Sequence, residues 1–229
     1  VCPSDGNGTV PTGASSANHA ISNYRHNGGP IGLGGGSNPA CPCGTNYNTS
    51  RPRAGVGNSN WTSTFNEGAS PISPASPSGC FHRNGVMIQA DGKRVKLAQI
   101  KLKDVTDGLS STILYGESRW ECSGQARISW ANSQAFDRTN TLVPINYDSC
   151  IFGSTAEEAL AKAQAQGKTG CEASNNWKTE RGFKSQHPGV ITVMMADGSV
   201  HIISETADHF VFNRLGCRGD TLVADISSL

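Results

Sequence analysis

One stretch near the C-terminal end of the chain constrains the fold more than any other. Residues 190–195 form a continuous apolar run with β-branched members, which favours a buried strand. Asp197-Gly198 follows at once, and apolar residues resume at 200–203. An Asp-Gly pair between two such runs indicates a hairpin, because both central residues of a type I′ turn need a positive φ. We therefore predict a β-hairpin over 187–203, with His187 at the entrance of its first strand.

The composition indicates a loop-rich protein outside the cytosol. Only 16% of the residues are charged, against ~25% in an average soluble domain, and 27 of the 229 residues are glycine. A net charge of +1 gives no basic face for nucleic acid or an anionic membrane surface. No window approaches the ~18 apolar residues of a membrane span. We therefore expect an exported, extracellular or cell-surface β protein whose targeting segment is not part of this sequence.

The eight cysteines point to the same compartment. Their even number and wide scatter favour up to four disulfides formed under oxidising conditions. Zinc is not expected, because no C-x-x-C pair is present. Only one residue separates Cys41 from Cys43, which would strain a mutual bridge, so each should find a distant partner. The pairing itself stays open among Cys2, Cys41, Cys43, Cys80, Cys122, Cys150, Cys171 and Cys217.

The middle of the chain holds signals for further β structure. A second Asp-Gly pair, Asp91-Gly92, separates the alternating stretches 84–90 and 93–97 and predicts a second hairpin. Residues 112–115 predict a strand that ends at Gly116-Glu117. We expect the two Asp-Gly hairpins to build one antiparallel sheet.

The clearest helix signal lies at residues 154–167. Ser154 and Glu157 have the spacing of a capping box, strong helix formers follow, and Gly167 suits the position just past the helix end. The segment has few large apolar residues, so we expect a surface insertion.

Two shorter helical segments are also predicted. Thr106 or Asp107 should cap a helical turn that runs to Ser111. A second helix is expected near 205–215. Its predicted core-facing residues are Phe210, Val211 and Leu215, followed by a stop at Gly216.

The N-terminal third differs from the rest of the chain. Residues 1–83 are rich in Gly, Asn and Ser, and we expect a loop-rich segment there, followed by a β-rich core over 84–229 in the same single domain. The stretch 70–78 is a Ser/Pro segment that is either a solvated loop or an O-glycan acceptor. The candidate glycosylation positions, which chance would also produce, are Asn7, Asn48, Asn60, Ser73 and Ser76.

The sequence does not predict an enzyme. It has no Gly-x-Ser-x-Gly elbow, and a chain with paired cysteines offers no catalytic thiol. His187 and Asp197 are expected to hold a strand entrance and a turn. The carboxylate pairs Asp104/Asp107 and Asp220/Asp225 do not follow the calcium-loop pattern, so turn and cap roles are favoured over a structural Ca²⁺. We expect no cofactor.

Several motifs, in chain order, carry a family resemblance. His187, nine residues and then Asp197-Gly198 resemble the H-x9-DG signature of a large bacterial family of prepilin-like proteins. Residues 2–5, 22–24, 84–86 and 104–112 resemble its CPSD, TNY or SNY, NGVF and D-[VI]-T-D-G-T-S-N-T motifs. The signature positions are His187, Asp197, Gly198, Asp104, Thr106, Asp107 and Gly108.

The resemblance implies a type IV pilin-like or pseudopilin-like architecture. In such proteins a long hydrophobic N-terminal helix precedes a β-rich head. The chain is expected to lack that helix, which would be its only route to a membrane. The expected fold is α+β and mostly β: a pilin-like antiparallel head with long Gly/Asn/Ser loops, one or two short helices and disulfides.

The expected function is association rather than catalysis. The chain would be a structural subunit of a surface filament or lattice, and its partners would be copies of itself or related pilin-like subunits. The alternative is a secreted module that binds a glycan or small solute through Trp61, Trp120, Trp130 or Trp177.

Overall fold

The fold was analysed in a computed structural model. The structure describes residues 22–30, 79–80, 86–88, 94–96, 100–124, 138–174, 176, 179–219, 224 and 226. The predictions for Cys2, Cys41, Cys43 and all five candidate glycosylation positions lie outside these residues.

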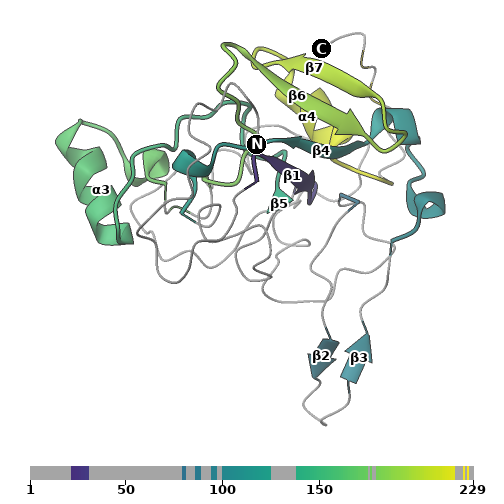
Figure 1. The fold of residues 1–229 in the computed structure, drawn as a ribbon, viewed down its shortest axis with the longest axis horizontal. Coiled ribbons are helices and arrows are strands. Elements are labelled where there is room, and N and C mark those ends of the chain that lie inside the picture. The colour runs from purple at the N-terminus through teal and green to yellow at the C-terminus, as the bar shows by residue number, and fades with distance from the viewer. Residues whose placement is uncertain are drawn as a thin grey trace.

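A five-stranded sheet with the strand order β5-β1-β4-β6-β7 forms the centre of the molecule (Figure 1). Neighbouring strands are antiparallel, except for the parallel pair β1 and β5. The strands are β1 (Tyr24–Asn27), β4 (Ile113–Glu117), β5 (Arg138–Thr139), β6 (Val190–Met195) and β7 (Val200–Ser204). The α+β, mostly β fold is therefore confirmed.

The predicted C-terminal hairpin is present as β6 and β7, but its turn is not type I′. Gly198 has a φ of +89°. Asn146 is the one non-glycine residue with a positive φ in the described part of the chain, so the φ of Asp197 is not positive, as a type I′ turn would require. Met195 N–H donates to the Ser199 carbonyl at 2.8 Å. This hydrogen bond closes a three-residue loop over 196–198. The Asp197 carboxylate accepts from Ser199 N–H at 2.8 Å. That local bond suits a three-residue loop in which only the glycine takes positive φ.

One face of the sheet packs against α4 (His209–Leu215) to form the core. The Phe183 and Phe212 rings meet edge to face, with centroids 5.9 Å apart. The predicted second helix is therefore confirmed, with a later start. Because the Asp208 side chain accepts from the first backbone N–H groups of α4, Phe212 rather than Phe210 faces the core. The core residues are Ile113, Ile145, Phe183, Ile191, Val193, Met195, Ile203, Phe212, Leu215 and Ala224.

Strand β1 lies within the segment that the sequence predicted to be loops. Its sequence is YRHN, and both Arg25 and Asn27 are buried. The Asn27 amide donates to the carbonyls of Ile113 at 2.9 Å and Gly216 at 3.0 Å. A polar strand of this kind lacks the alternation on which a strand prediction depends. The main sheet therefore contains strands from both sides of residue 83.

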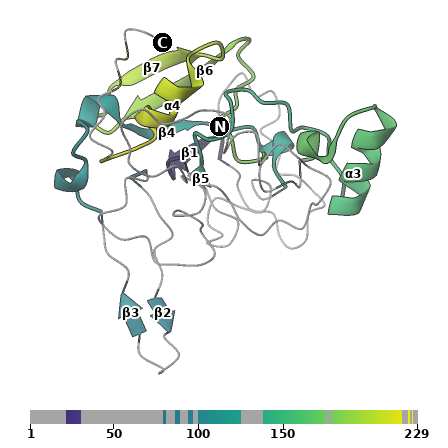
Figure 2. The same ribbon diagram turned by 180° about the vertical axis from the view of Figure 1, so that it is seen from behind.

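The second Asp-Gly hairpin is also present, but it belongs to a separate sheet. Strands β2 (Val86–Ile88) and β3 (Arg94–Lys96) pair only with each other among the described strands. Figures 1 and 2 show this hairpin projecting away from the main sheet. The expectation of one sheet built on both hairpins is wrong: β6 pairs with β4 and β7, and β2 and β3 form a two-stranded sheet of their own.

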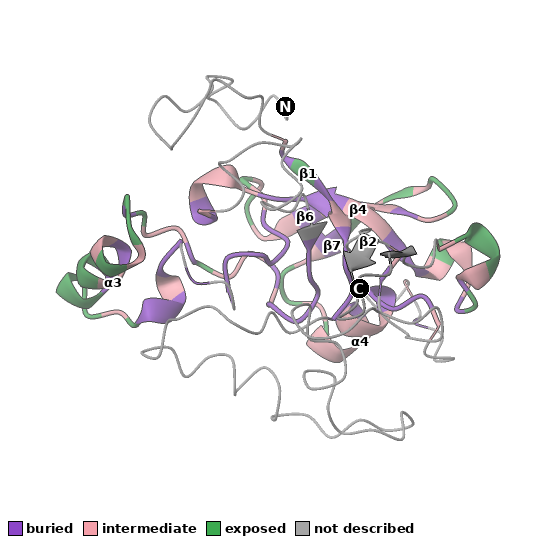
Figure 3. Ribbon diagram, turned by 90° about the horizontal axis from the view of Figure 1, so that it is seen from below, coloured by how far each residue is buried: buried purple, intermediate pink, exposed green. Residues whose placement is uncertain are grey.

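Helix α3 (Ala156–Ala165) confirms the predicted surface helix with a cap shifted by one residue. The Thr155 hydroxyl accepts from Glu158 N–H at 3.2 Å, and the Glu158 carboxylate accepts from Ser154 N–H at 2.7 Å. The helix end confirms Gly167, which has a φ of +69°. The helix buries only Ala159 and Ala163, and Figure 3 shows its largely exposed surface.

Four 3-10 turns complete the described elements: η1 (Leu102–Asp104), η2 (Leu109–Ser111), η3 (Trp120–Cys122) and η4 (Gly170–Glu172). The cap of η2 is Gly108, with a φ of +101°, so the predicted cap at Thr106 or Asp107 is wrong. Both residues instead donate backbone N–H groups to the Arg218 carbonyl, at 2.7 and 3.2 Å. They join this turn to the segment after α4.

The β6–β7 turn makes a direct stability prediction. We expect Gly198→Val to lower the free energy of unfolding by about 1–2 kcal/mol, because a residue with a Cβ is strained at positive φ. A Cβ at Gly198 would meet nothing within 4 Å, so the loss would come from the backbone alone. Chemical denaturation measures it. Gly198→Asn is the matched control and should lose less, because Asn tolerates this region; equal stability of Gly198→Val and wild type would contradict the prediction.

Candidate functional site

The signature histidine and a buried carboxylate meet where β4 and β6 adjoin. His187 Nε2 lies 3.6 Å from Glu117 Oε1. The other oxygen of Glu117 accepts from Thr192 N–H at 2.7 Å, and its backbone carbonyl accepts from Lys184 N–H at 3.0 Å. The His187 ring is partly exposed, whereas the Glu117 side chain is buried. Glu117 thus joins the end of β4 to β6, and the His187 ring lies next to the Glu117 carboxylate, just before β6 begins.

The Asp-Gly end of the signature meets the second motif at the other end of β6. Ala196 N–H donates to the Thr112 carbonyl at 2.8 Å, and Asp197 N–H donates to the Leu109 carbonyl at 3.1 Å. The Thr112 hydroxyl in turn donates to the Gly108 carbonyl at 3.0 Å. Through these hydrogen bonds the 104–112 motif holds the β6–β7 turn in place.

The remaining signature residues have local partners. The Asp104 carboxylate accepts from Lys101 N–H at 2.8 Å, which closes η1. Asp107 is buried. His187 and Asp197 lie at opposite ends of β6 and do not form a pair. In the described residues, the signature groups bind mainly backbone of their own chain, which is the chemistry of a scaffold.

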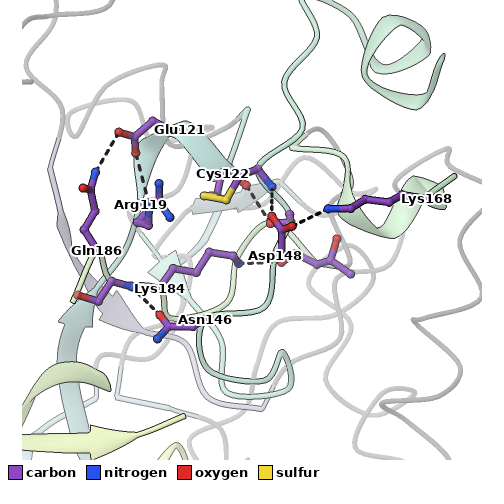
Figure 4. The surroundings of a disulfide bond; sticks show 12 residues. Arg119, Glu121, Cys122, Asn146, Asp148, Lys168, Lys184 and Gln186 are labelled. Carbon is purple, nitrogen blue, oxygen red and sulfur yellow. Dashed lines mark hydrogen bonds and ion pairs between the residues drawn. A yellow bond between two sulfur atoms is a disulfide. The ribbon is translucent and has the colours of Figure 1, made fainter. Parts of the chain in front are cut away.

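A buried lysine lies beside the disulfide (Figure 4). Lys184 is 2% exposed, and its ammonium donates to the Thr179 carbonyl at 3.1 Å. Burial lowers the pKa of Lys184 to about 7, against the opposing effect of the nearby Glu180 carboxylate. Glu180 is also buried and accepts from Gly124 N–H at 2.7 Å. This amine has no access to solvent and therefore acts within the structure.

The disulfide joins Cys122 and Cys150 across 28 residues of sequence. The Ser149 hydroxyl donates to the Cys122 carbonyl at 3.0 Å. The Asp148 carboxylate accepts from Lys168 Nζ at 2.8 Å, and that hydrogen bond lowers the pKa of Asp148 (Figure 4). The bridge therefore links η3 to the stretch 148–150, and the ion pair links that stretch to Lys168, after the end of α3.

Not every cysteine follows the expected pairing. Cys171 is also in a disulfide. Cys80 and Cys217 are thiols, which corrects the expectation that all eight cysteines form bridges. Cys217 is fully buried, and burial raises the pKa of Cys80 to about 11. The raised pKa of Cys80 disfavours the thiolate through which disulfides form.

The second candidate site is the edge of the main sheet at β7, which pairs with β6 alone among the described strands. Val200 is 64% exposed and Ile202 is 68% exposed, whereas Ile203, on the opposite face, is 1% exposed. The register with β6 is continuous along the whole strand. Two large β-branched side chains therefore point to solvent on a regular edge strand.

A comparison with known families places the chain. A family model described as "Protein of unknown function (DUF1559)" matches residues 1–209, which is most of the chain. The chain belongs to this family. No curated protein and no solved structure matches it. Among the described residues of this DUF1559 protein, no helix has the length and apolar character needed to cross a membrane.

The residues considered for ligands are not gathered in the described part of the DUF1559 chain. No group of three or more His, Cys, Asp or Glu side chains is placed there to hold a metal ion. Asp104 belongs to the η1 cap, and Asp220 and Asp225 lie outside the described residues. Trp120 is half-buried on η3, and the other tryptophans of the glycan-binding alternative also lie outside.

Sequence reasoning missed two buried charged residues of this DUF1559 protein, Glu117 and Lys184. Glu117 was predicted only as the end of a strand, and Lys184 was assigned no role. A charged residue between apolar positions carries no local sign of burial, because its partners come from distant segments. The one available signal was the presence of Gly116-Glu117 at the end of a family-like motif.

The Glu117 contacts predict an order of mutational effects. Glu117→Ala should lower the free energy of unfolding by about 1–3 kcal/mol, because it leaves Thr192 N–H without its acceptor. His187→Ala should cost less than about 1 kcal/mol, since the ring is 42% exposed and its ion pair is long. Urea denaturation of both variants tests this order, and a larger loss for His187→Ala would contradict it.

Lys184 predicts a pH dependence of stability. Its pKa is about 7 in the folded chain and near 10.5 when unfolded, so unfolding takes up a proton between these values. The free energy of unfolding from this group therefore rises as the pH rises from about 7 to 10.5. Lys184→Met should remove that rise, relative to wild type, in denaturation at several pH values. Exposed Lys101→Met is the matched control and should follow wild type; an unchanged pH profile in Lys184→Met would refute the prediction.

Proposed function

We propose that this chain is a structural subunit of an extracellular or cell-surface filament or lattice and that it acts by associating with its own kind. The observation that carries the proposal is the β7 edge, where Val200 and Ile202 are exposed side by side on one face. Regular edge strands with exposed apolar side chains pair readily with other strands. In a free monomer, this surface is an aggregation hazard, which association would relieve.

The signature cluster supports a structural role. Glu117 and the signature residue Asp104 accept from the backbone N–H groups of Thr192 and Lys101. The signature residue Asp197 accepts from the N–H and hydroxyl groups of Ser199 within its own turn. Such contacts stabilise a head domain on which association surfaces can be carried. The proposal therefore assigns no catalytic step to His187 or Asp197.

The covalent chemistry supports an exported location. A disulfide such as Cys122–Cys150 persists in an oxidising environment and is rare in the cytosol. A charged fraction of only 16% agrees with export. We place the subunit at the cell surface or beyond it.

The experiment that tests the function is a measurement of self-association. Light scattering and negative-stain electron microscopy of the wild-type chain should show assemblies whose size grows with protein concentration. The double variant Val200→Ser/Ile202→Ser should assemble less, because it removes the exposed apolar surface of β7.

Leu102→Ser provides the matched control. Leu102 is 64% exposed, close to the exposure of the β7 residues, but lies on η1. It should assemble like wild type. A wild-type chain that stays monomeric at every concentration would overturn the proposed function.

A further inference from the structure

Strand β7 pairs with β6 on one side and with no other described strand on its opposite side. Ser199 accepts from Met195 N–H, and Glu205 N–H donates to the Gly189 carbonyl, both at 2.8 Å. Hydrogen-bonded pairs in an antiparallel ladder recur at every second residue. His201 and Ile203 therefore bond to β6, while the residues between them direct their N–H and C=O groups away from it.

The outward-directed residues are 200, 202 and 204, whose side chains share the solvent-facing side of the sheet. In the described part of the chain, no backbone group bonds to the N–H of Val200 or Ile202. The Ser204 carbonyl accepts from Ala207 N–H at 3.1 Å, so the free edge ends there. The docking surface is thus three residues long.

The usual protections of an edge strand are missing from β7. Its sequence, VHIIS, contains no lysine, proline or carboxylate, and its ladder with β6 has no bulge. Because β7 carries no Lys, Arg, Asp or Glu, it offers no charge to attract a charged partner and none to repel a second copy of β7. This absence of charge, together with the outward N–H and C=O groups, favours a second copy of this strand.

The spacing of the outward groups fixes how two copies can meet. Antiparallel pairing joins outward-directed residues to each other, and a two-fold axis requires the pairing to be the same for both chains. Centring the axis on Ile202 uses all three residues: Ile202 faces Ile202 of the second copy, and Val200 faces Ser204. Glu205 then faces Ser199 of the second copy, so no like charges oppose each other.

From this register we infer that β7 pairs antiparallel with β7 of a second copy about a two-fold axis at Ile202, joining two five-stranded sheets into one. The inference rests on the proposed function and names the partner of its site. The exposed Val200 and Ile202 of both chains then form one apolar strip on the solvent-facing side. Cross-strand aliphatic pairs of this kind stabilise a ladder.

A charge exchange at position 202 tests the register. Ile202→Lys and Ile202→Glu should each weaken dimerisation about tenfold or more, because like charges would face each other at the axis. An equimolar mixture of the two variants should restore dimers, since Lys and Glu would then oppose. Sedimentation velocity measures each sample, and a thermal melt checks that the exposed substitutions leave the fold intact.

Two further pairs sharpen the test. Val200→Lys mixed with Ser204→Glu should also dimerise better than Val200→Lys alone, because these positions face each other off the axis. Leu102→Lys mixed with Ile202→Glu is the matched control. It should dimerise no better than wild type mixed with Ile202→Glu, since η1 and β7 do not meet in this arrangement.

The outcomes separate the two proposals. Dimers restored in the Ile202→Lys and Ile202→Glu mixture support the β7 register. If wild type assembles and Ile202→Lys assembles equally well, or if the mixture stays as weak as its components, the register is overturned while the proposed function stands. A wild-type chain that never associates would overturn both.

Discussion

The described fold depends on one buried carboxylate. Glu117 ends β4, yet its side chain accepts from Thr192 N–H on β6 and its carbonyl accepts from Lys184 N–H. A buried carboxylate is costly unless its oxygens are satisfied, so this geometry is retained only while β4, β6 and the segment before β6 stay together. His187 lies at the open side, with its Nε2 3.6 Å from Glu117 Oε1. The opposite end of β6 is held by neutral backbone bonds from Ala196 and Asp197.

The contacts at the two ends of β6 show which features of the fold the H-x9-DG signature predicts and which it does not. Features that depend on neighbours in sequence were predicted correctly. They are the apolar run of β6, the glycine of its turn and the end of α3 at Gly167. The polar strand β1 was missed because Arg25 and Asn27 are buried by partners far along the chain, among them Ile113 and Gly216. Glu117 and Lys184 escaped prediction for the same reason.

Turn and cap chemistry shows the same limit at a finer scale. The Asp197-Gly198 hairpin and the α3 cap were each placed within a residue, but the turn class and the capping pair were wrong. In both cases a neighbouring polar side chain offered a competing hydrogen bond, from Ser199 N–H to Asp197 and from Ser154 N–H to Glu158. Such choices among near-equal local bonds depend on the surrounding backbone, which a motif does not contain.

The signature residues hydrogen-bond within their own chain, whereas the exposed Val200 and Ile202 lie on the β7 edge, so the fold separates stability from association. That separation has a consequence for assembly. A β7 contact about a two-fold axis is isologous and closes on itself, so it yields a dimer and no more. A filament or lattice built from this chain must add a second contact on a different surface, through which dimers join. Substitutions in β7 should then leave that second contact intact, while substitutions at the second contact should leave dimers. The β7 pair would thus be the building block of the assembly rather than the whole of it.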